Sequence, residues 1–409
     1  MSTAAAATGN GMLQVEEARQ TLLDAVAPRD TSSEPVSLDA AEGRILAEDL
    51  TATIAVPSWD NSAMDGYAVR TADLSEDPGV ELPVSQYIPA GQAPKPLRSG
   101  TAARIFTGAP VPENADAVIM QENCTALDGR VRIDKPVEAG ANIRAAGEDI
   151  RQGATILTAG RRLQPQDIAL AASVGIPQLP VRRPLRIAVL ATGDELVPPG
   201  ETLGAGQIHD SNGPLMAGLV RRIGCELVHS CRVADTSEAT REALNSAAAD
   251  ADLILTSGGV SVGEEDHVKA AIESLGSLEL WKIAVKPGKP LAFGHLGNTP
   301  LIGLPGNPVS LFVTFLLFAA PVIRRLQGRD TLFPKPAPVP AGFECDKPGK
   351  REEYLRVRLS KGRLEAFPKQ GSGVLSSAVW ADGLAQVPAG ARISPGDVVD
   401  FFSFSDLVF

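Results

Sequence analysis

The chain has 409 residues, 44% of them hydrophobic, which is enough for about two to four domains with packed cores. Its 38 Lys and Arg against 49 Asp and Glu give a net charge of −11. That balance argues against a nucleic-acid or anionic-membrane partner, because both need a basic face. A local basic pocket for a small anion remains compatible with it.

Four cysteines and four histidines form no C-x-x-C or H-E-x-x-H spacing, so we do not expect a structural zinc site. No disulfide framework is needed, which suits a reducing, cytoplasmic compartment. Residues 1–11 have neither a basic stretch nor an apolar run, and we expect a mobile tail there rather than a signal peptide. The longest apolar run, residues 311–323, is too short for a bilayer and predicts a buried helix.

The pattern of apolar residues changes twice along the first half of the chain. Apolar residues at helical spacing predict helices at 13–27, 39–50 and 161–175. Between them, short apolar runs alternate with Gly and Pro turns, which predicts a β-rich module. We therefore expect a helical, discontinuous linking domain at 12–52 plus 146–180, with the β-rich module at 53–145.

The second half alternates strands with helices, which predicts a doubly wound, mostly parallel sheet. The expected strands are 185–192, 226–233, 252–257, 278–285 and 300–304, and the expected helices are 213–223, 237–251, 265–275 and 307–327. This multidomain α/β chain would have its α/β domain at 181–328. The short alternating strands after a proline-rich linker predict a small C-terminal β-barrel at 329–409.

Residues 252–267, DLILTSGGVSVGEEDH, contain the G-x-S-x-G pattern of a serine-hydrolase elbow around Ser261. The order of partners disfavours that interpretation, because no Ser, then acid, then His series follows in the expected spacing. The alternative is a binding loop. Glycines let backbone N–H groups approach a ligand, and Ser257 and Ser261 add hydroxyls beside Gly258 and Gly259.

Similar turns follow other strands of the predicted sheet. Ligands of such sheets bind beyond the carboxyl ends of the strands, so these turns should converge on one edge. The residues expected there are Thr192, Glu195, Asp235, Asp266, Pro305, Asn307 and Pro308. Nearby, the proline-stiffened segment WKIAVKPGKP supplies Lys282, Lys286 and Lys289, which suit an oxyanion. A solvated basic turn is the alternative explanation for these lysines.

The combination of DNSAMDGYAV at 60–69 with ATGDEL, TSGGVSVGEED, KPGKP and GLPGNPVS resembles one family. It is the MoeA family of molybdopterin molybdenumtransferases, whose relatives include the gephyrin E-domain. The resemblance covers residues 12–409. It implies four domains, a pterin-binding sheet domain, and an elongated homodimer whose sites are shared between subunits. The implied reaction joins molybdate to adenylylated molybdopterin with release of AMP and requires Mg²⁺.

The resemblance also assigns roles to residues of this chain. The functional acids fall on Asp60, Asp149, Glu195, Asp235 and Asp266, of which Glu195, Asp235 and Asp266 are candidate metal ligands. The substrate-binding positions fall on Thr107, Lys282, Lys286, Lys289, Pro305 and Pro308, with Arg351 and Ser372 matched by weaker motifs.

Two alternatives stay open from the sequence. A molybdopterin adenylyltransferase would bind the same ligand with the same sheet domain, but it would use ATP. A scaffold that holds the cofactor without catalysis is the other possibility. In the enzyme interpretation, an upstream adenylyltransferase is a possible protein partner that supplies the adenylylated pterin.

Overall fold

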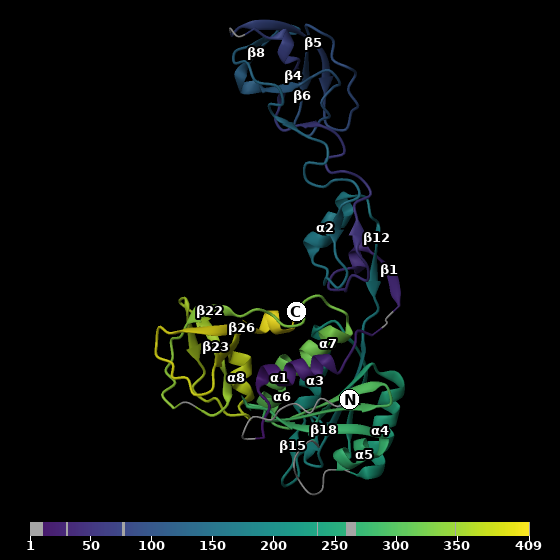
Figure 1. Ribbon diagram of the computed structural model, residues 1–409, viewed down its shortest axis with the longest axis vertical. Helices are drawn as coiled ribbons and strands as arrows, with labels where there is room; N and C mark the ends of the chain where they lie inside the picture. The colour runs from purple at the N-terminus through teal and green to yellow at the C-terminus, as the bar shows by residue number, and fades with distance from the viewer. Residues whose placement is uncertain are drawn as a thin grey trace.

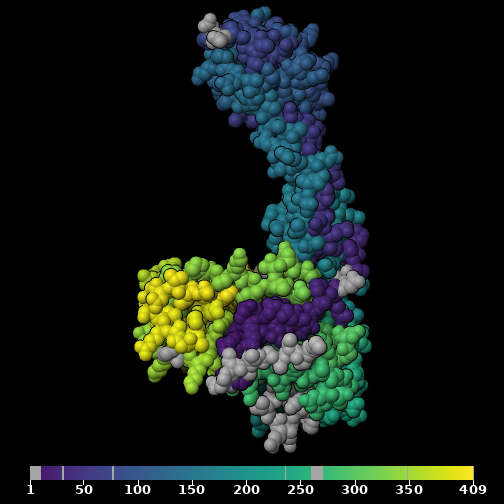
Figure 2. All heavy atoms as spheres, in the orientation of Figure 1, coloured from purple at the N-terminus to yellow at the C-terminus, as the bar shows by residue number. Residues whose placement is uncertain are grey.

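The structure is a computed structural model that describes residues 11–29, 32–75, 78–234, 236–258, 267–347 and 349–408. The chain is elongated (Figure 1), with β4 (Gly66–Val69), β5 (Val80–Ile88), β6 (Ala102–Ile105) and β8 (Cys124–Leu127) at one end and the helices and sheets of the second half at the other. Between the two ends lie β1 (Ser33–Ser37), β12 (Gln178–Arg182) and α2 (Pro165–Ser173). Figure 2 shows that this middle part is also narrow when all atoms are drawn.

The first helix belongs to the core of the second half. Helix α1 (Val15–Asp24) starts with a capping box in which Gln14 and Glu17 satisfy each other's backbone N–H groups. Its Ala18 and Leu22 are fully buried in the same core cluster as the α/β sheet, and α1 packs against α7 (Ala320–Leu326). Helix α1 therefore packs with the α/β unit, although it belongs to the predicted linking segment 12–52.

The linking part contains more strand than the sequence predicted. Strand β1 (Ser33–Ser37) pairs with β12 (Gln178–Arg182), and β2 (Leu50–Thr51) pairs with β11 (Thr155–Leu157), both antiparallel. Helix α2 (Pro165–Ser173) packs against them. The predicted helix at 39–50 is wrong, because the described chain has a 3₁₀ turn at Leu38–Ala40 and then Gly43 at φ +74°, a left-handed conformation that ends helical geometry.

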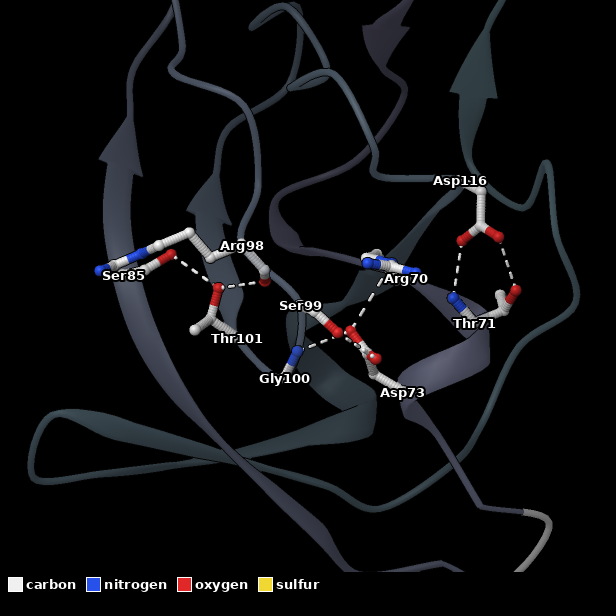
Figure 3. Close-up of polar contacts among 9 residues, drawn as sticks. All are labelled: Arg70, Thr71, Asp73, Ser85, Arg98, Ser99, Gly100, Thr101 and Asp116. Atoms are coloured by element: carbon white, nitrogen blue, oxygen red, sulfur yellow. Dashed lines mark hydrogen bonds and ion pairs between the residues drawn. The ribbon is translucent and has the colours of Figure 1, made fainter.

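The β-rich module is one six-stranded sheet with the order β7-β4-β6-β5-β9-β8. Its strands are β4 (Gly66–Val69), β5 (Val80–Ile88), β6 (Ala102–Ile105), β7 (Ala117–Met120), β8 (Cys124–Leu127) and β9 (Arg130–Ile133). Carboxylates connect its loops through hydrogen bonds (Figure 3). Asp116 accepts hydrogen bonds from Thr71 N and Oγ1, and Asp73 accepts from Ser99 Oγ and Gly100 N.

The α/β unit has a six-stranded sheet with the order β16-β13-β17-β21-β20-β18. The strands are β13 (Arg186–Thr192), β16 (Glu226–Val233), β17 (Leu253–Ser257), β18 (Gly276–Lys282), β20 (Pro290–Leu296) and β21 (Thr299–Leu304). The first four in the order are parallel, as predicted, whereas β20 pairs antiparallel with both β21 and β18. Strand β20 was not among the predicted strands. Helices α3 (Asn212–Arg222), α4 (Ser237–Asp250) and α5 (His267–Leu275) connect the strands.

A long apolar helix crosses the core of this unit. It comprises α6 (Pro308–Thr314), a π-helical turn at Phe315–Ala319, and α7. The turn widens where Pro321 has no N–H for the carbonyl of Leu317. Pro308–Leu326 is the one helix of the described chain that is long and apolar enough to cross a membrane. Because it is buried among the sheet and the other helices, it is a core helix.

The C-terminal β unit joins the α/β unit through a short strand. Its sheet has the order β19-β23-β25-β26-β22, with β24 paired to β23. The strands are β19 (Val285–Lys286), β22 (Ala337–Pro340), β23 (Glu352–Ser360), β24 (Arg363–Ala366), β25 (Gly383–Val387) and β26 (Val398–Ser403). Since β19 directly follows β18 and pairs with β23, the lysine-bearing segment lies on the seam between the two units.

Candidate functional site

The carboxyl ends of β13 and β17 pack against each other without spare room. Thr192 Oγ1 donates a hydrogen bond to the carbonyl of Ser257 at 3.2 Å. Gly258 has φ +81°, and a Cβ at this position would lie 2.6 Å from the Thr192 carbonyl oxygen. Only glycine fits such an approach. The Ser257 Oγ is buried and has no hydrogen-bond partner within the described chain, so it is a hydroxyl that can serve a ligand.

The turn between β21 and α6 reaches the same edge. Asn212, the first residue of α3, donates its side-chain N–H to the Gly306 carbonyl at 2.7 Å. A Cβ on Gly306 would lie 4.0 Å from the Cα of Gly258, so the two glycine turns are neighbours. Asn307 precedes α6 in an extended conformation and Pro308 occupies its first turn. The sequence prediction missed Asn212, which fixes this turn from another helix.

Glu195 lies on the third turn of this edge. Gly193 has φ +144°, and a Cβ there would lie 2.6 Å from Glu195 Oε2, so the carboxylate is folded back over the glycine. A cavity of about 380 Å³ opens beside it, with Gly193 and Arg232 in its wall. Arg232 donates to the Leu196 carbonyl and brings positive charge to this cavity. The edge can therefore accommodate a polar ligand next to the Glu195 carboxylate and the Arg232 guanidinium.

Part of the predicted site lies outside the described residues. These positions are Asp235, Gly259, Ser261 and Asp266. Within the described chain, no group of three or more His, Cys, Asp or Glu side chains is placed to hold a metal ion. Of the three predicted metal ligands, Glu195 alone is described, and one carboxylate at a polar edge is compatible with Mg²⁺ but does not form a site by itself.

The lysine segment and the C-terminal β unit meet beside the start of α6. Lys286 Nζ forms an ion pair with Glu353 Oε1 at 2.8 Å, and Arg351 Nη1 donates to the Val285 carbonyl at 3.1 Å. The carbonyl of Ser372 accepts a hydrogen bond from Val309 N at 3.0 Å. Arg351 and Ser372 thus touch the two segments that carry the predicted oxyanion and pterin contacts. Glu353, the partner of Lys286, was not predicted.

The flanking lysines of the segment are exposed, while their backbones hold it in place. Lys282 accepts a hydrogen bond from Leu13 N at 2.9 Å through its carbonyl, and Lys289 accepts one from Ile283 N at 2.8 Å. Gly288 lies at φ +109°, where a Cβ would be 2.4 Å from Thr314 Cγ2. The loop that bears the three ammonium groups is therefore packed directly on α6.

The N-terminal acids form a second group around the β-rich module. Asp60 Oδ1 accepts a hydrogen bond from Ala146 N at 2.8 Å. Thr107 donates its N–H and its hydroxyl to Asp65 Oδ1, at 2.8 and 2.7 Å. These two hydrogen bonds hold the pKa of Asp65 below its ordinary value. Asp149 N donates to the Val56 carbonyl at 3.1 Å, where the module meets the linking part.

This second group is remote from the sheet edge within one chain. Asp65 and Thr107 flank strands β4 and β6, which lie at the opposite end of the molecule from β18 and α4–α6 (Figure 1). Asp65 was not among the predicted site residues. Its signal in the sequence is the Asp-Gly pair immediately before a strand.

Comparison with known proteins accounts for nearly the whole chain. Residues 13–175 match the MoeA N-terminal region (domain I and II), 188–325 a probable molybdopterin binding domain, and 338–404 the MoeA C-terminal region (domain IV). The molybdopterin molybdenumtransferase of Haemophilus influenzae is 44% identical over 320 residues, which are 78% of each chain. The chain belongs to the MoeA family.

Other members of the MoeA family agree in length and fold. The molybdopterin molybdenumtransferase of Nostoc sp. is 40% identical over 88% of this chain and 85% of its own. The solved MoeA protein of Pyrococcus horikoshii is 33% identical, has a TM-score of 0.80, and covers 96% of this chain and 99% of its own. The matches to the N- and C-terminal regions separate this chain from proteins that contain only the molybdopterin-binding domain. It is a molybdopterin molybdenumtransferase-type enzyme of molybdenum cofactor biosynthesis.

Proposed function

We propose that this enzyme inserts molybdate into adenylylated molybdopterin and releases AMP. The observation that carries the proposal is that two sites of different chemistry, the sheet edge and the Lys286 segment, both adjoin α6. A glycine-packed edge with a buried, unpartnered Ser257 hydroxyl within the described chain adjoins α6, and the C-terminal β unit links α6 to the Lys286 segment. The first kind of site suits a pterin nucleotide and the second suits an oxyanion.

The residue types match the charges of the reactants. Molybdate is a small dianion, and the ammonium groups of Lys286 and Lys289 with the Arg351 guanidinium can bind it through charge-assisted hydrogen bonds. Release of AMP breaks a phosphoanhydride, so the edge must also hold phosphoryl oxygens. The buried Ser257 hydroxyl at the carboxyl end of β17 is suited to that role.

The acids of the edge would hold the divalent cation. Mg²⁺, when bound, would polarise a phosphoryl oxygen of the adenylylated pterin. Glu195, whose carboxylate is already folded toward the edge, is the described ligand in this proposal, with Asp235 and Asp266 as the others. Without the cation these carboxylates would repel an anionic substrate, so they set the metal dependence of binding.

We propose further that the enzyme is a homodimer in which each site uses both chains. Strands β4 and β6 of the β-rich module lie at the opposite end of one chain from α6 and β18 (Figure 1), so in this proposal a second chain brings Asp60, Thr107 and Asp149 to the edge. Closed two-fold pairing is the commonest way to do this. An upstream adenylyltransferase would supply the pterin, and the compartment would be the cytoplasm.

The remaining domain assignments are also proposals. We keep the discontinuous linking domain at 12–52 plus 146–180, with boundaries at 53–145, 181–328 and 329–409. For the C-terminal unit we propose a closed barrel. A bridge joins Ala341, just after β22 at one end of the sheet path, to Leu364 of β24, which pairs with β23 near the other end, and this supports closure.

Substitution of Lys286 tests whether this lysine binds molybdate rather than the pterin. Lys286→Ala should raise the molybdate concentration for half-maximal cofactor synthesis about tenfold or more, because it removes a charge-assisted bond worth roughly 1.5 to 3 kcal/mol. The affinity for adenylylated pterin, measured by calorimetry, should change far less. Lys335→Ala, which removes an exposed lysine from the linker to the C-terminal unit, is the matched control. Equal losses for both ligands would assign Lys286 to the pterin phosphate instead.

A further inference from the structure

An arginine-lined cavity lies between the linking part and the α/β unit, away from the site described above. Its volume is about 180 Å³. The arginines in its wall are Arg44, Arg162, Arg182, Arg183, Arg221 and Arg222. The first four come from the linking part and the segment directly after β12, and the last two from the final turn of α3. Glu42 is the one carboxylate in the described lining.

This concentration of positive charge stands out in a chain of net charge −11. The dipole of α3 favours Arg221 and Arg222 at its carboxyl end, but it does not explain four further arginines from another part of the fold. Glu34, just outside the described lining, forms an ion pair with Arg44 at 2.5 Å. The described wall of the cavity thus brings six arginines together with one carboxylate.

Two of these arginines, Arg162 and Arg182, lie in unfavourable surroundings. Burial lowers the pKa of Arg162, and the charge of Arg222 lowers it further, with Glu42 opposing both. Arg182 Nε is buried and meets no hydrogen-bond acceptor within the described chain. A buried donor without an acceptor destabilises the folded state. An anion in the cavity would remove both penalties, since it supplies negative charge and acceptor oxygens together.

We propose that this cavity binds a compact phosphate-type oxyanion, inorganic phosphate or diphosphate, which holds the linking part against the α/β unit. Guanidinium groups match phosphate oxygens through paired hydrogen bonds. Since water occupies about 30 Å³ per molecule in the liquid, the cavity admits a phosphate with some of its hydration. It is smaller than the roughly 300 Å³ at which pockets for drug-sized ligands begin, so a whole nucleotide is not expected.

Calorimetric titration of the full chain with phosphate, and separately with diphosphate, tests this proposal. We expect one saturable site per chain at low salt in a buffer without other oxyanions. Arg222→Ala should weaken binding tenfold or more, and Arg183→Ala should also weaken it. Arg241→Ala removes an exposed arginine on α4 that is not part of the lining, so it should change the affinity less than twofold. Arg222→Lys keeps the charge without the planar fork and should lose at least threefold.

Two further variants separate this cavity from the proposed active site. Lys286→Ala should retain phosphate binding while it loses molybdate, and Arg222→Ala should leave AMP affinity unchanged. Several results would overturn the proposal. They are the absence of saturable binding, equal losses in Arg222→Ala and Arg241→Ala, loss of phosphate binding in Lys286→Ala, or weaker AMP binding in Arg222→Ala. Each of these can occur whether or not the chain inserts molybdenum, so the two proposals fail separately.

Discussion

The sheet edge and the β-rich module place polar residues by different means. At the edge, Gly258 and Gly288 have left-handed backbones and neighbours so close that a Cβ would collide with them. In the module, Gly108 has φ +79° with nothing within 4 Å, and the loop beside it is fixed by the carboxylate of Asp65 bonded to Thr107. The edge is therefore shaped by packing, and the module loops are shaped by exposed hydrogen-bonded acids.

The largest expected effect is that of a methyl group on the packed edge. Gly258→Ala should destabilise the α/β unit by about 2 to 4 kcal/mol, because it combines backbone strain with overpacking against the Thr192 carbonyl. Gly108→Ala has the same strain without the collision, so it should cost about 1 kcal/mol. Urea unfolding of both variants measures the difference. Equal costs would show that packing does not distinguish the two regions.

The module loop should instead respond to acid. The hydrogen bonds from Thr107 lower the pKa of Asp65, so this carboxylate stabilises the fold above the ordinary value of 3.8. That contribution is lost as the pH falls below 3.8 through the pKa of the folded state. The amide resonance of Thr107 should titrate with a midpoint below 3.8, and Asp65→Asn should abolish the titration. A midpoint at or above 3.8 would contradict the hydrogen bonding described here.

The smallest effect concerns a hydroxyl on the packed edge. Ser257→Ala should leave the free energy of unfolding within about 0.5 kcal/mol of the parent, because this buried Oγ has no partner within the described chain. Pterin affinity should fall about fivefold to tenfold if the hydroxyl serves the ligand. Thr314→Val is the matched control, because Thr314 Oγ1 donates to the Ser310 carbonyl at 2.7 Å. It should lose stability and keep pterin affinity, and the reverse pattern would remove Ser257 from the site.

The sequence predicted β13, β17 and β21 well because each is a largely apolar run. Strand β20 was missed, since Pro290 opens it and Gly294 interrupts its residue pattern. The helix expected at 39–50 failed at Gly43, whose left-handed backbone ends helical geometry. Turn chemistry therefore limited the prediction of the fold more than hydrophobic patterning did.

The site was predictable where residues are neighbours along the chain. The turns at Thr192, Gly258 and Pro308 follow directly from strand ends or begin a helix. Partners from distant segments were not predictable, because nothing local marks them. Glu353 reaches Lys286 only through the pairing of β19 with β23, and Asn212 reaches Gly306 from another helix. The roles of all the predicted site residues, those of Asp235, Ser261 and Asp266 included, remain predictions.

Mixed dimers test the shared site most directly. Asp60→Asn keeps an acceptor for Ala146 N but loses the charge, and Glu195→Ala removes the acid at the sheet edge. Each variant alone should be folded and inactive. Refolded together, half of the dimers would be mixed, and each mixed dimer would hold one intact site and one doubly altered site. The preparation should regain roughly a quarter of the parent activity.

Asp60→Asn mixed with Asp149→Ala is the control, because both changes fall on the N-terminal side of the site and no intact site can form. This second mixture should stay inactive. If mixed dimers of Asp60→Asn and Glu195→Ala demonstrably form and show no activity, each chain keeps its own site and the shared-site proposal is wrong.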